Sequence, residues 1–470
     1  MNKVKYIILT IISLLLYGYA PNQYDKIYCI ACFIVFIAVV FSIIKDEFRR
    51  YGILTFNIVF FSSFFLCTYA FPVFLMGSDS VISELLMSFL GSYHTVTRAV
   101  SLSTFAISIY GLGYVLVRNK SGNINITKTE RRFAKKISIL AKIVLILLTI
   151  VLIVANWKYI SIADGEPDLG GFEYVFALFF LSLPLYLVSS VLGDKNSANS
   201  RHALISFFKN NKVVFLLELL LILVFLLLGN RGPVIQIVFV VIATIILYVK
   251  RISYKILFFI GLVALLVMFT LRTTRQMDNV SASKGIAEAA SNANTVWDLF
   301  SDLVGINFEL NAGMQYVDEN GYLYPGANLI RYFACPIPHL STVLVNAFYG
   351  VEIETVSTEQ VIKKYTQHSA GNHCVIDVYM CFGVIGVAIV FFLFGLLVAN
   401  VTNGLAGNFF CKVFYIYLMG TSLYFPRSSL MYGYRNYVTL YFLILFLGIM
   451  YKTRYKHYDT GSVSDGISKQ

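Results

Sequence analysis

Apolar residues fall in long blocks along this chain, separated by short polar segments, rather than in the brief alternations of a soluble fold. Blocks of about 17 to 25 apolar residues are long enough to cross a bilayer as helices. We predict about twelve spans, near residues 6–20, 27–44, 53–77, 97–117, 138–156, 173–193, 213–229, 233–249, 255–271, 376–399, 408–425 and 436–450.

Composition supports the same class. Of the 470 residues, 58% are hydrophobic and only 13% are charged, whereas about a quarter of the residues of soluble proteins are charged. Because a helix satisfies its own backbone hydrogen bonds within a bilayer, the predicted fold is an all-α integral membrane protein.

The basic residues predict the orientation of the chain, because cytoplasmic loops collect Lys and Arg. The segment RNKSGNINITKTERRFAKK at 118–136 is the clearest such loop. An orientation with both termini in the cytoplasm places most Lys and Arg inside and most Asp and Glu outside. The net charge of +12 is then a topology signal, and binding to nucleic acid loses its main support.

The predicted organisation is uneven, with one long loop late in the chain. Residues 1–271 hold spans one to nine with the basic loop 118–137, 376–458 hold spans ten to twelve, and 459–470 form a cytoplasmic tail. Between them, 272–375 form one large extracytoplasmic loop, which we predict to be the functional head. It contains an expected amphipathic helix, SKGIAEAASNANTVWDLFSDLVG, and a turn-rich segment, YVDENGYLYPGAN.

An arginine interrupts two apolar runs in LLLGNRGPVIQIV, residues 226–238. Gly229 is typical of a helix end and Pro233 of a helix start, so we predict a tight outer hairpin at 230–232. The positive end of the second helix and the Arg231 guanidinium together favour a phosphate or carboxylate site. The alternative is that Arg231 only extends to the membrane interface.

Other outer arginines strengthen the first interpretation. They lie near predicted span ends or beside aromatic segments, at Arg272, Arg275, Arg331, Arg427 and Arg435. Such a set is suited to lining one outward cavity that holds a polyanion, although each member alone also fits a solvated loop charge.

Two outer histidines are candidates for acid–base chemistry. His373 lies four residues before Asp377, so on a helix the two share a face; His339 lies in PIPHLS and also fits a packed loop residue. Cys335 and Cys374 fit either two free thiols or a disulfide.

Several signatures are missing from the sequence. It contains no P-loop, no HExxH, no dinucleotide fingerprint and no convincing set of metal ligands, so we expect no metal and no cofactor. Charge within the predicted spans is sparse, with Lys142 and Glu218 the main cases. An ion-driven transporter is therefore disfavoured.

The order of these features resembles the Wzy-type polymerases of O-antigen and capsule repeat units. The segments on which this resemblance rests are LLLGNRGPVI, the re-entry segment GNHCVIDVYMCFGVIGVAIVFFLFG and the aromatic segment PRSSLMYGYRNYVTLYF. The resemblance implies a GT-C-like fold in the bacterial cytoplasmic membrane and an inverting, metal-independent glycosyltransferase. It also implies undecaprenyl-diphosphate-linked glycans as substrates and a Wzz-type chain-length regulator as partner.

The resemblance also assigns residue roles as expectations. Arg231 is expected to stabilise the leaving diphosphate, and His373, with His339 in reserve, to activate the acceptor hydroxyl with Asp377 orienting it. Diphosphate or glycan binding is expected at Arg272, Arg275, Arg331, Arg427, Tyr434 and Arg435. Two rival functions remain open, a lipid-linked oligosaccharide flippase and an O-antigen ligase; the long outer loop disfavours the flippase.

Overall fold

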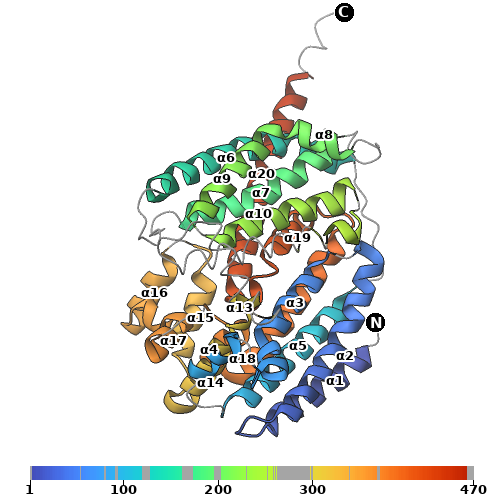
Figure 1. Cartoon of the computed structure of the whole chain (residues 1–470). Helices are drawn as coiled ribbons and strands as arrows, with labels where there is room; N and C mark the ends of the chain where they lie inside the picture. The colour runs from blue at the N-terminus through green and yellow to red at the C-terminus, as the bar shows by residue number, and fades with distance from the viewer. Residues whose placement is uncertain are drawn as a thin grey trace, which may run out of the picture.

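The computed structural model describes residues 3–52, 54–78, 81–89, 94–118, 128–160, 173–194, 203–228, 230–250, 252–257, 259, 261, 297, 300–337, 339–367 and 371–462. Every regular element in these ranges is a helix, which confirms the all-α class for this part of the chain. Figure 1 shows three groups of helices: α6 to α10 lie across the top, α1 to α3 and α5 at the lower right, and α13 to α17 at the lower left.

The first half of the chain supplies two of these groups. The lower-right group and its neighbours are α1 (Lys3–Gly18), α2 (Lys26–Tyr51), α3 (Phe56–Thr68), the π-helical η1 (Ala70–Leu75), α4 (Val81–Phe89) and α5 (Val96–Val117). The top group is α6 (Lys128–Ile160), α7 (Glu173–Gly193), α8 (Ala203–Asn210), α9 (Lys212–Leu227), α10 (Arg231–Thr244) and the π-helical η2 (Ile245–Val249).

The second half supplies the lower-left group and the last helices. The lower-left group is α13 (Ser301–Val304), α14 (Asn307–Asn320), α15 (Pro325–Ala334), α16 (Leu340–Tyr349), the 3₁₀ turn η4 (Ile353–Val356) and α17 (Thr358–Thr366). The chain then forms α18 (Cys374–Gly404), α19 (Phe409–Thr421), the 3₁₀ turn η5 (Phe425–Arg427) and α20 (Met431–Ser462).

Six of the described helical segments are long and apolar enough to cross a membrane, and a bent pair makes a possible seventh. The six lie in α2, α5, α6, α7, α10 with η2, and α18; the bent pair is α8 with α9, at 76°. Several other predicted spans coincide with shorter helices because the backbone breaks within the apolar run, as where η1 follows α3 at Tyr69. Residues 262–271 of the predicted ninth span lie outside the described residues, and twelve spans stay a prediction.

One local expectation for the long outer loop is wrong. The segment YVDENGYLYPGAN, expected to be turn-rich, is helical through Asn320, the last residue of α14. Gly321 has a φ of 79°, a conformation that favours glycine, and ends α14 there. The turn is limited to residues 321–324, because Pro325 starts α15. Of the predicted amphipathic helix at 283–305, residues 283–296 lie outside the described residues.

The helices α5 and α18 touch through glycine at two levels. A Cβ atom added to Gly113 on α5 would collide with the carbonyl oxygen of Phe392, and one added to Gly395 on α18 would collide with that of Tyr110. Small residues let helix backbones approach closely in membrane proteins. This glycine seam joins the N-terminal helices to the helix that follows the long loop.

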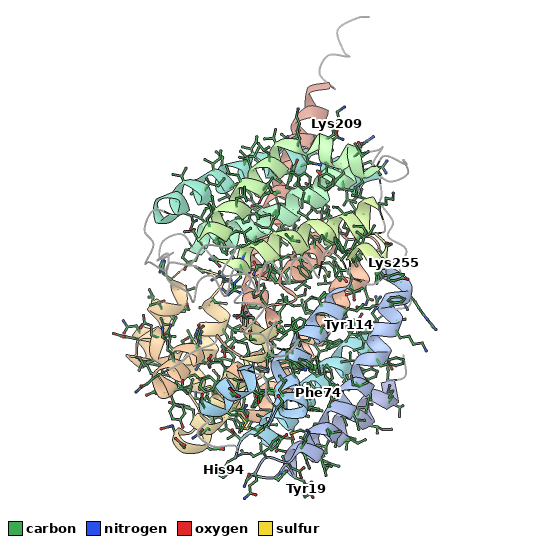
Figure 2. The ribbon with its side chains drawn as sticks, in the orientation of Figure 1. Tyr19, Phe74, His94, Tyr114, Lys209 and Lys255 are labelled. Carbon is green, nitrogen blue, oxygen red and sulfur yellow. The ribbon has the colours of Figure 1, made fainter. Side chains whose placement is uncertain are left out.

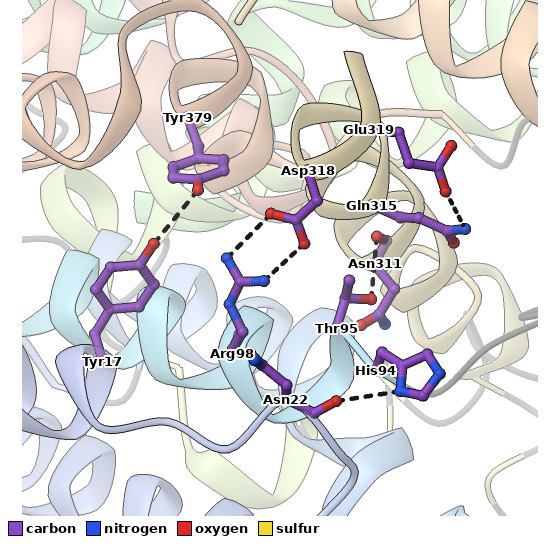
Figure 3. A network of polar contacts seen from close by, with 10 residues as sticks. All are labelled: Tyr17, Asn22, His94, Thr95, Arg98, Asn311, Gln315, Asp318, Glu319 and Tyr379. Atoms are coloured by element: carbon purple, nitrogen blue, oxygen red, sulfur yellow. Dashed lines mark hydrogen bonds and ion pairs between the residues drawn. The ribbon is translucent and has the colours of Figure 1, made fainter. Parts of the chain in front are cut away.

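Polar contacts fix α14 against the ends of the N-terminal helices (Figure 3). The Arg98 guanidinium of α5 donates two hydrogen bonds to the Asp318 carboxylate of α14, at 2.7 and 3.1 Å. The Thr95 hydroxyl donates to the carbonyl of Asn311 at 3.3 Å. A bidentate pair of this kind fixes orientation as well as distance, so α14 is held in one position.

A buried ion pair lies at the far end of α10 from Arg231. The Lys412 ammonium at the start of α19 is 2.6 Å from the Glu130 carboxylate of α6, and these side chains are 0% and 7% exposed. The charge of Glu130 acts on the hydroxyl of Tyr248 in η2. Tyr248 lies 17 positions after Arg231, which corresponds to about 25 Å along a helix.

Glu218 and Lys142, the main charged residues within predicted spans, lie in different surroundings. The Glu218 carboxylate on α9 is buried and accepts a hydrogen bond of 3.2 Å from the Thr149 hydroxyl on α6. Lys142, also on α6, lines a small cavity of about 270 Å³. Figure 2 shows Lys209 at one end of the molecule and Tyr19 and His94 at the other, and the orientation in the membrane stays a prediction.

Candidate active site

Arg231 is the first residue of α10, with Asn230 before it as the helix N-cap. The predicted hairpin is therefore confirmed in outline, although the helix starts two residues before Pro233. The Arg231 side chain is 20% exposed and its guanidinium lies 3.1 Å from the Asp302 carboxylate of α13, which is 42% exposed. The long loop thus reaches the start of α10 and places a carboxylate beside this arginine.

Tyr424, just before η5, brings a second arginine to the same place. The Arg427 guanidinium lies 5.7 Å from the centre of the Tyr424 ring, and a Cβ added to Gly232 would lie 3.6 Å from the Tyr424 hydroxyl oxygen. The charges of Arg427, Arg231 and Asp302 all act on that hydroxyl. We call these four residues, Arg231, Asp302, Tyr424 and Arg427, the arginine site.

Arg427 also connects the arginine site to the segment before α18. Gly371 has a φ of 125°, and a Cβ there would lie 3.6 Å from the Arg427 carbonyl oxygen and 4.0 Å from its guanidinium. The positive φ favours glycine at this position, and the distances place Gly371 in contact with Arg427. Two residues later comes His373, so that histidine lies behind the arginine site.

His373 is fully buried and caps α18. Its Nδ1 accepts a hydrogen bond from the backbone N–H of Val375 at 3.2 Å, so the proton of the neutral ring is on Nε2. That atom is 3.1 Å from the Thr68 hydroxyl oxygen, to which it donates. Burial lowers the pKa of His373 to about 3. Both ring nitrogens are engaged, which differs from the expectation of a base open to an acceptor hydroxyl.

Asp377, one turn into α18, holds the long loop rather than the histidine ring. Its buried carboxylate accepts hydrogen bonds from the hydroxyls of Tyr332 on α15, at 2.6 Å, and Thr358 on α17. The side-chain amide of Asn372 donates a third at 3.1 Å. Burial and the neighbouring Asp377 charge raise the pKa of Tyr332 well above its usual range. These hydrogen bonds of Asp377 therefore fix α15 and α17 against α18.

Two further predicted arginines converge on Cys335. Burial raises the pKa of the Cys335 thiol to about 11, against the opposing charges of Arg435 and Arg331. The Arg331 guanidinium donates to the Val356 carbonyl at 3.3 Å. Tyr434, 39% exposed, meets Phe333 edge to face with ring centres 6.5 Å apart. The four predicted site arginines that the structure describes thus fall into two groups, Arg231 with Arg427 and Arg331 with Arg435.

The remaining predicted residues lie elsewhere. His339 is exposed, has a left-handed φ of 59°, and donates its backbone N–H to the Tyr174 hydroxyl at 3.3 Å. Arg272 and Arg275 lie outside the described residues. All seven cysteines are free thiols, which resolves the alternative for Cys335 and Cys374. Among the described residues, no group of three or more His, Cys, Asp or Glu side chains has a geometry suited to a metal ion.

Comparison with protein families decides the wider identity. The family model for the O-antigen polysaccharide polymerase Wzy matches residues 3–457, nearly the whole chain. The chain belongs to the Wzy family. No curated protein and no solved structure matches it. Membership of the Wzy family makes the chain a polymerase of O-antigen type and a polysaccharide-forming glycosyltransferase.

The sequence prediction missed Asp302 and Tyr424, which complete the arginine site in this Wzy chain. Asp302 belongs to the segment expected as an amphipathic helix, where nothing distinguishes it from the other polar positions. Tyr424 precedes the arginine-bearing turn, and a tyrosine in an aromatic-rich segment carries no signal of its own. Both are found only when the folded chain brings distant segments together.

Proposed function

We propose that this Wzy chain joins undecaprenyl-diphosphate-linked repeat units on the outer face of the bacterial cytoplasmic membrane. The growing glycan on its lipid diphosphate is the donor, and a single lipid-linked repeat unit is the acceptor. The observation that carries the proposal is the convergence of Arg231 and Arg427 on Tyr424 beside the start of α10. This arrangement suits the diphosphate common to both substrates.

The proposed reaction is a single displacement with inversion. The acceptor hydroxyl oxygen attacks the anomeric carbon of the donor, the bond from that carbon to the diphosphate oxygen breaks, and undecaprenyl diphosphate leaves with the electron pair. Negative charge grows on the diphosphate as the bond breaks. Arg231 and Arg427 stabilise that charge, which lowers the barrier without any movement of the protein during the step.

The proton of the acceptor hydroxyl goes to Asp302 in this proposal. In the structure its carboxylate is paired with Arg231. When the diphosphate oxygens bind Arg231 in place of Asp302, the Asp302 carboxylate becomes available within reach of the reacting sugar. His373 then acts as a positioning residue, because its contacts fix the start of α18 behind Arg427. His339, Arg331, Arg435 and Tyr434 are proposed as glycan-binding residues away from the diphosphate.

The test replaces Arg231 in a strain that lacks its own copy of the gene. We expect Arg231→Ala to collapse the surface glycan ladder to single repeat units, and to slow polymerisation by purified protein by about 10²–10³-fold. Arg231→Lys keeps the charge but loses the planar fork of donors, so it restores only part of the rate. Membrane abundance of both variants, measured by immunoblot, should equal that of the wild type.

A matched control is available. Arg50 forms one ion pair of 3.0 Å with Asp46 and is 22% exposed, close to the values for Arg231. Arg50→Ala should leave the ladder intact. A normal ladder with both Arg231 variants contradicts the proposed site, whereas complete lipid-linked polymer that never reaches its final acceptor contradicts the polymerase function and favours a ligase.

A further inference from the structure

The α6–α7 cleft, at the end of the bundle opposite the arginine site, carries a second group of cations. It is a cavity of about 1260 Å³ lined by Arg131, Arg132 and Lys135 of α6, by Ser189 and Ser190 of α7, and by Asn210 of α8. Among the described residues that line the cleft, Asp194 is the one with an acidic side chain. The hydroxyls of Ser189 and Ser190 donate to backbone carbonyls of α7, and the Asn210 amide donates to the Asp194 carboxylate at 3.2 Å. The balance of charge in the cleft is therefore positive, and the cations of α6 are what it offers to an anion.

Close packing of the two helices forms this cleft. A Cβ atom added to Gly193 at the end of α7 would lie 2.9 Å from the Cα of Lys135, so α7 meets α6 backbone to backbone below the cations. The first turns of α6 therefore project their side chains past the end of α7. This backbone contact fixes the positions from which the cationic side chains extend before any ligand arrives.

One donor in the cleft has no hydrogen-bond partner among the described residues. The Nε–H of Arg131 is buried without one. Leaving a buried donor unsatisfied costs about 1–3 kcal/mol, and in native proteins such a group calls for an explanation. Arginine donates through Nε and Nη together to phosphate oxygens, so a phosphate group is the ligand that this geometry suits.

The surface of α6 next to the cleft is apolar and open. Ile139 is 65% exposed and Ile143, one turn further along, is 52% exposed. Arg132, Lys135, Ile139 and Ile143 follow one another at helical spacing, so they share one face of α6. Along that face the cationic side chains come first and the apolar side chains follow. This order matches the headgroup and acyl chains of a phospholipid.

We propose that the α6–α7 cleft binds the phosphate of an anionic phospholipid, with the acyl chains along Ile139 and Ile143. The free phosphate ion shares the headgroup chemistry, but it gives no reason for the apolar continuation of the face. Under the predicted topology the site faces the cytoplasmic leaflet. The inference is independent of the polymerase mechanism proposed for the arginine site.

The test uses the full chain in nanodiscs of phosphatidylcholine with increasing phosphatidylglycerol, and reads retained phosphatidylglycerol by native mass spectrometry. A cation near the membrane surface contributes about fivefold to anionic lipid binding. We therefore expect Arg132→Gln with Lys135→Gln to weaken retention on the order of 25-fold. Arg131→Lys keeps the charge and loses the Nε donor, so we expect a several-fold loss without any change of net charge.

The control removes two cations outside the cleft. Lys45 and Arg49 are exposed on the last turns of α2. Lys45→Gln with Arg49→Gln removes the same charge and so loses only the general attraction of a cationic surface, and it should retain several-fold more phosphatidylglycerol than the cleft variant. The unfolding temperature in phosphatidylcholine alone checks that all variants are folded, and Arg131→Lys serves as the test if the double variant is not. Equal retention by cleft and control variants overturns the proposal, and so does displacement of the lipid by an equal concentration of inorganic phosphate.

Discussion

Two ion pairs at opposite ends of α10 use the same chemistry in different surroundings. Lys412 and Glu130 lie 2.6 Å apart with almost no exposure, whereas Arg231 and Asp302 lie 3.1 Å apart at 20% and 42% exposure. If either member of the buried pair changes partner, the other charge stays inside the protein without it, which is costly. The exposed pair exchanges partners at small cost, so it can give up its arginine to a diphosphate. Burial therefore separates the pair that holds the fold from the pair suited to reaction.

The largest expected effect is on the buried pair. Lys412→Met removes the cation that lies 2.6 Å from the buried Glu130 carboxylate, which should destabilise the protein by about 3–5 kcal/mol. Thermal unfolding of the purified protein measures this loss. Adding Glu130→Gln should recover much of it, because no lone charge then remains. If Lys412→Met alone unfolds like the wild type, burial does not distinguish the two pairs.

Asp302→Asn tests the more exposed ion pair, between Arg231 and Asp302. It removes the proposed proton acceptor, so polymerisation by purified protein should slow about a hundredfold, or ~2.7 kcal/mol in barrier height. Unfolding temperature should change little, since an exposed pair contributes at most about 1 kcal/mol. Asp46→Asn, in the pair with Arg50, serves as the matched control. A wild-type rate for Asp302→Asn would restrict Asp302 to holding Arg231.

Asp377→Asn tests a buried carboxylate that lies close to the arginine site. Replacing it weakens three hydrogen bonds to a charged group, and we expect α15 and α17 to loosen by about 2 kcal/mol. Hydrogen exchange in those two helices gives the measurement. Asp318→Asn, in the more exposed pair with Arg98, should have a smaller effect. Unchanged exchange in the Asp377 variant would mean that other contacts hold the loop.

The smallest expected effect is a pH dependence from His373. Its folded pKa of about 3 lies below the ordinary value of 6.5, so the unfolded chain takes up the proton first as the pH falls. Stability from this group is complete above about pH 6.5 and declines by about 1.4 kcal/mol per pH unit below it. His373→Asn keeps a helix cap and should remove that slope, as unfolding at pH 5 and pH 7 would show. Equal slopes in both proteins would contradict a neutral, buried His373.

Sequence patterns predict helices better than they predict where one helix breaks. The apolar runs locate the helices because burial against lipid needs apolar side chains, and Arg231 is identified because it interrupts such a run. The bend between α8 and α9 at Asn211 and the continuation of α14 to Asn320 depend on local caps and packing that a hydropathy pattern does not record. The contact between Asp302 and Arg231 joins residues 71 positions apart, and no local pattern encodes it.

The glycine seam between α5 and α18 has a consequence for how a long product is handled. Backbones that touch at Gly113 and Gly395 leave no side-chain layer to slide or compress. The frame that carries α18, and with it the segment beside Arg427, is therefore rigid from one turnover to the next. We expect the glycan to advance by one repeat past this frame while the contact between α5 and α18 stays unchanged.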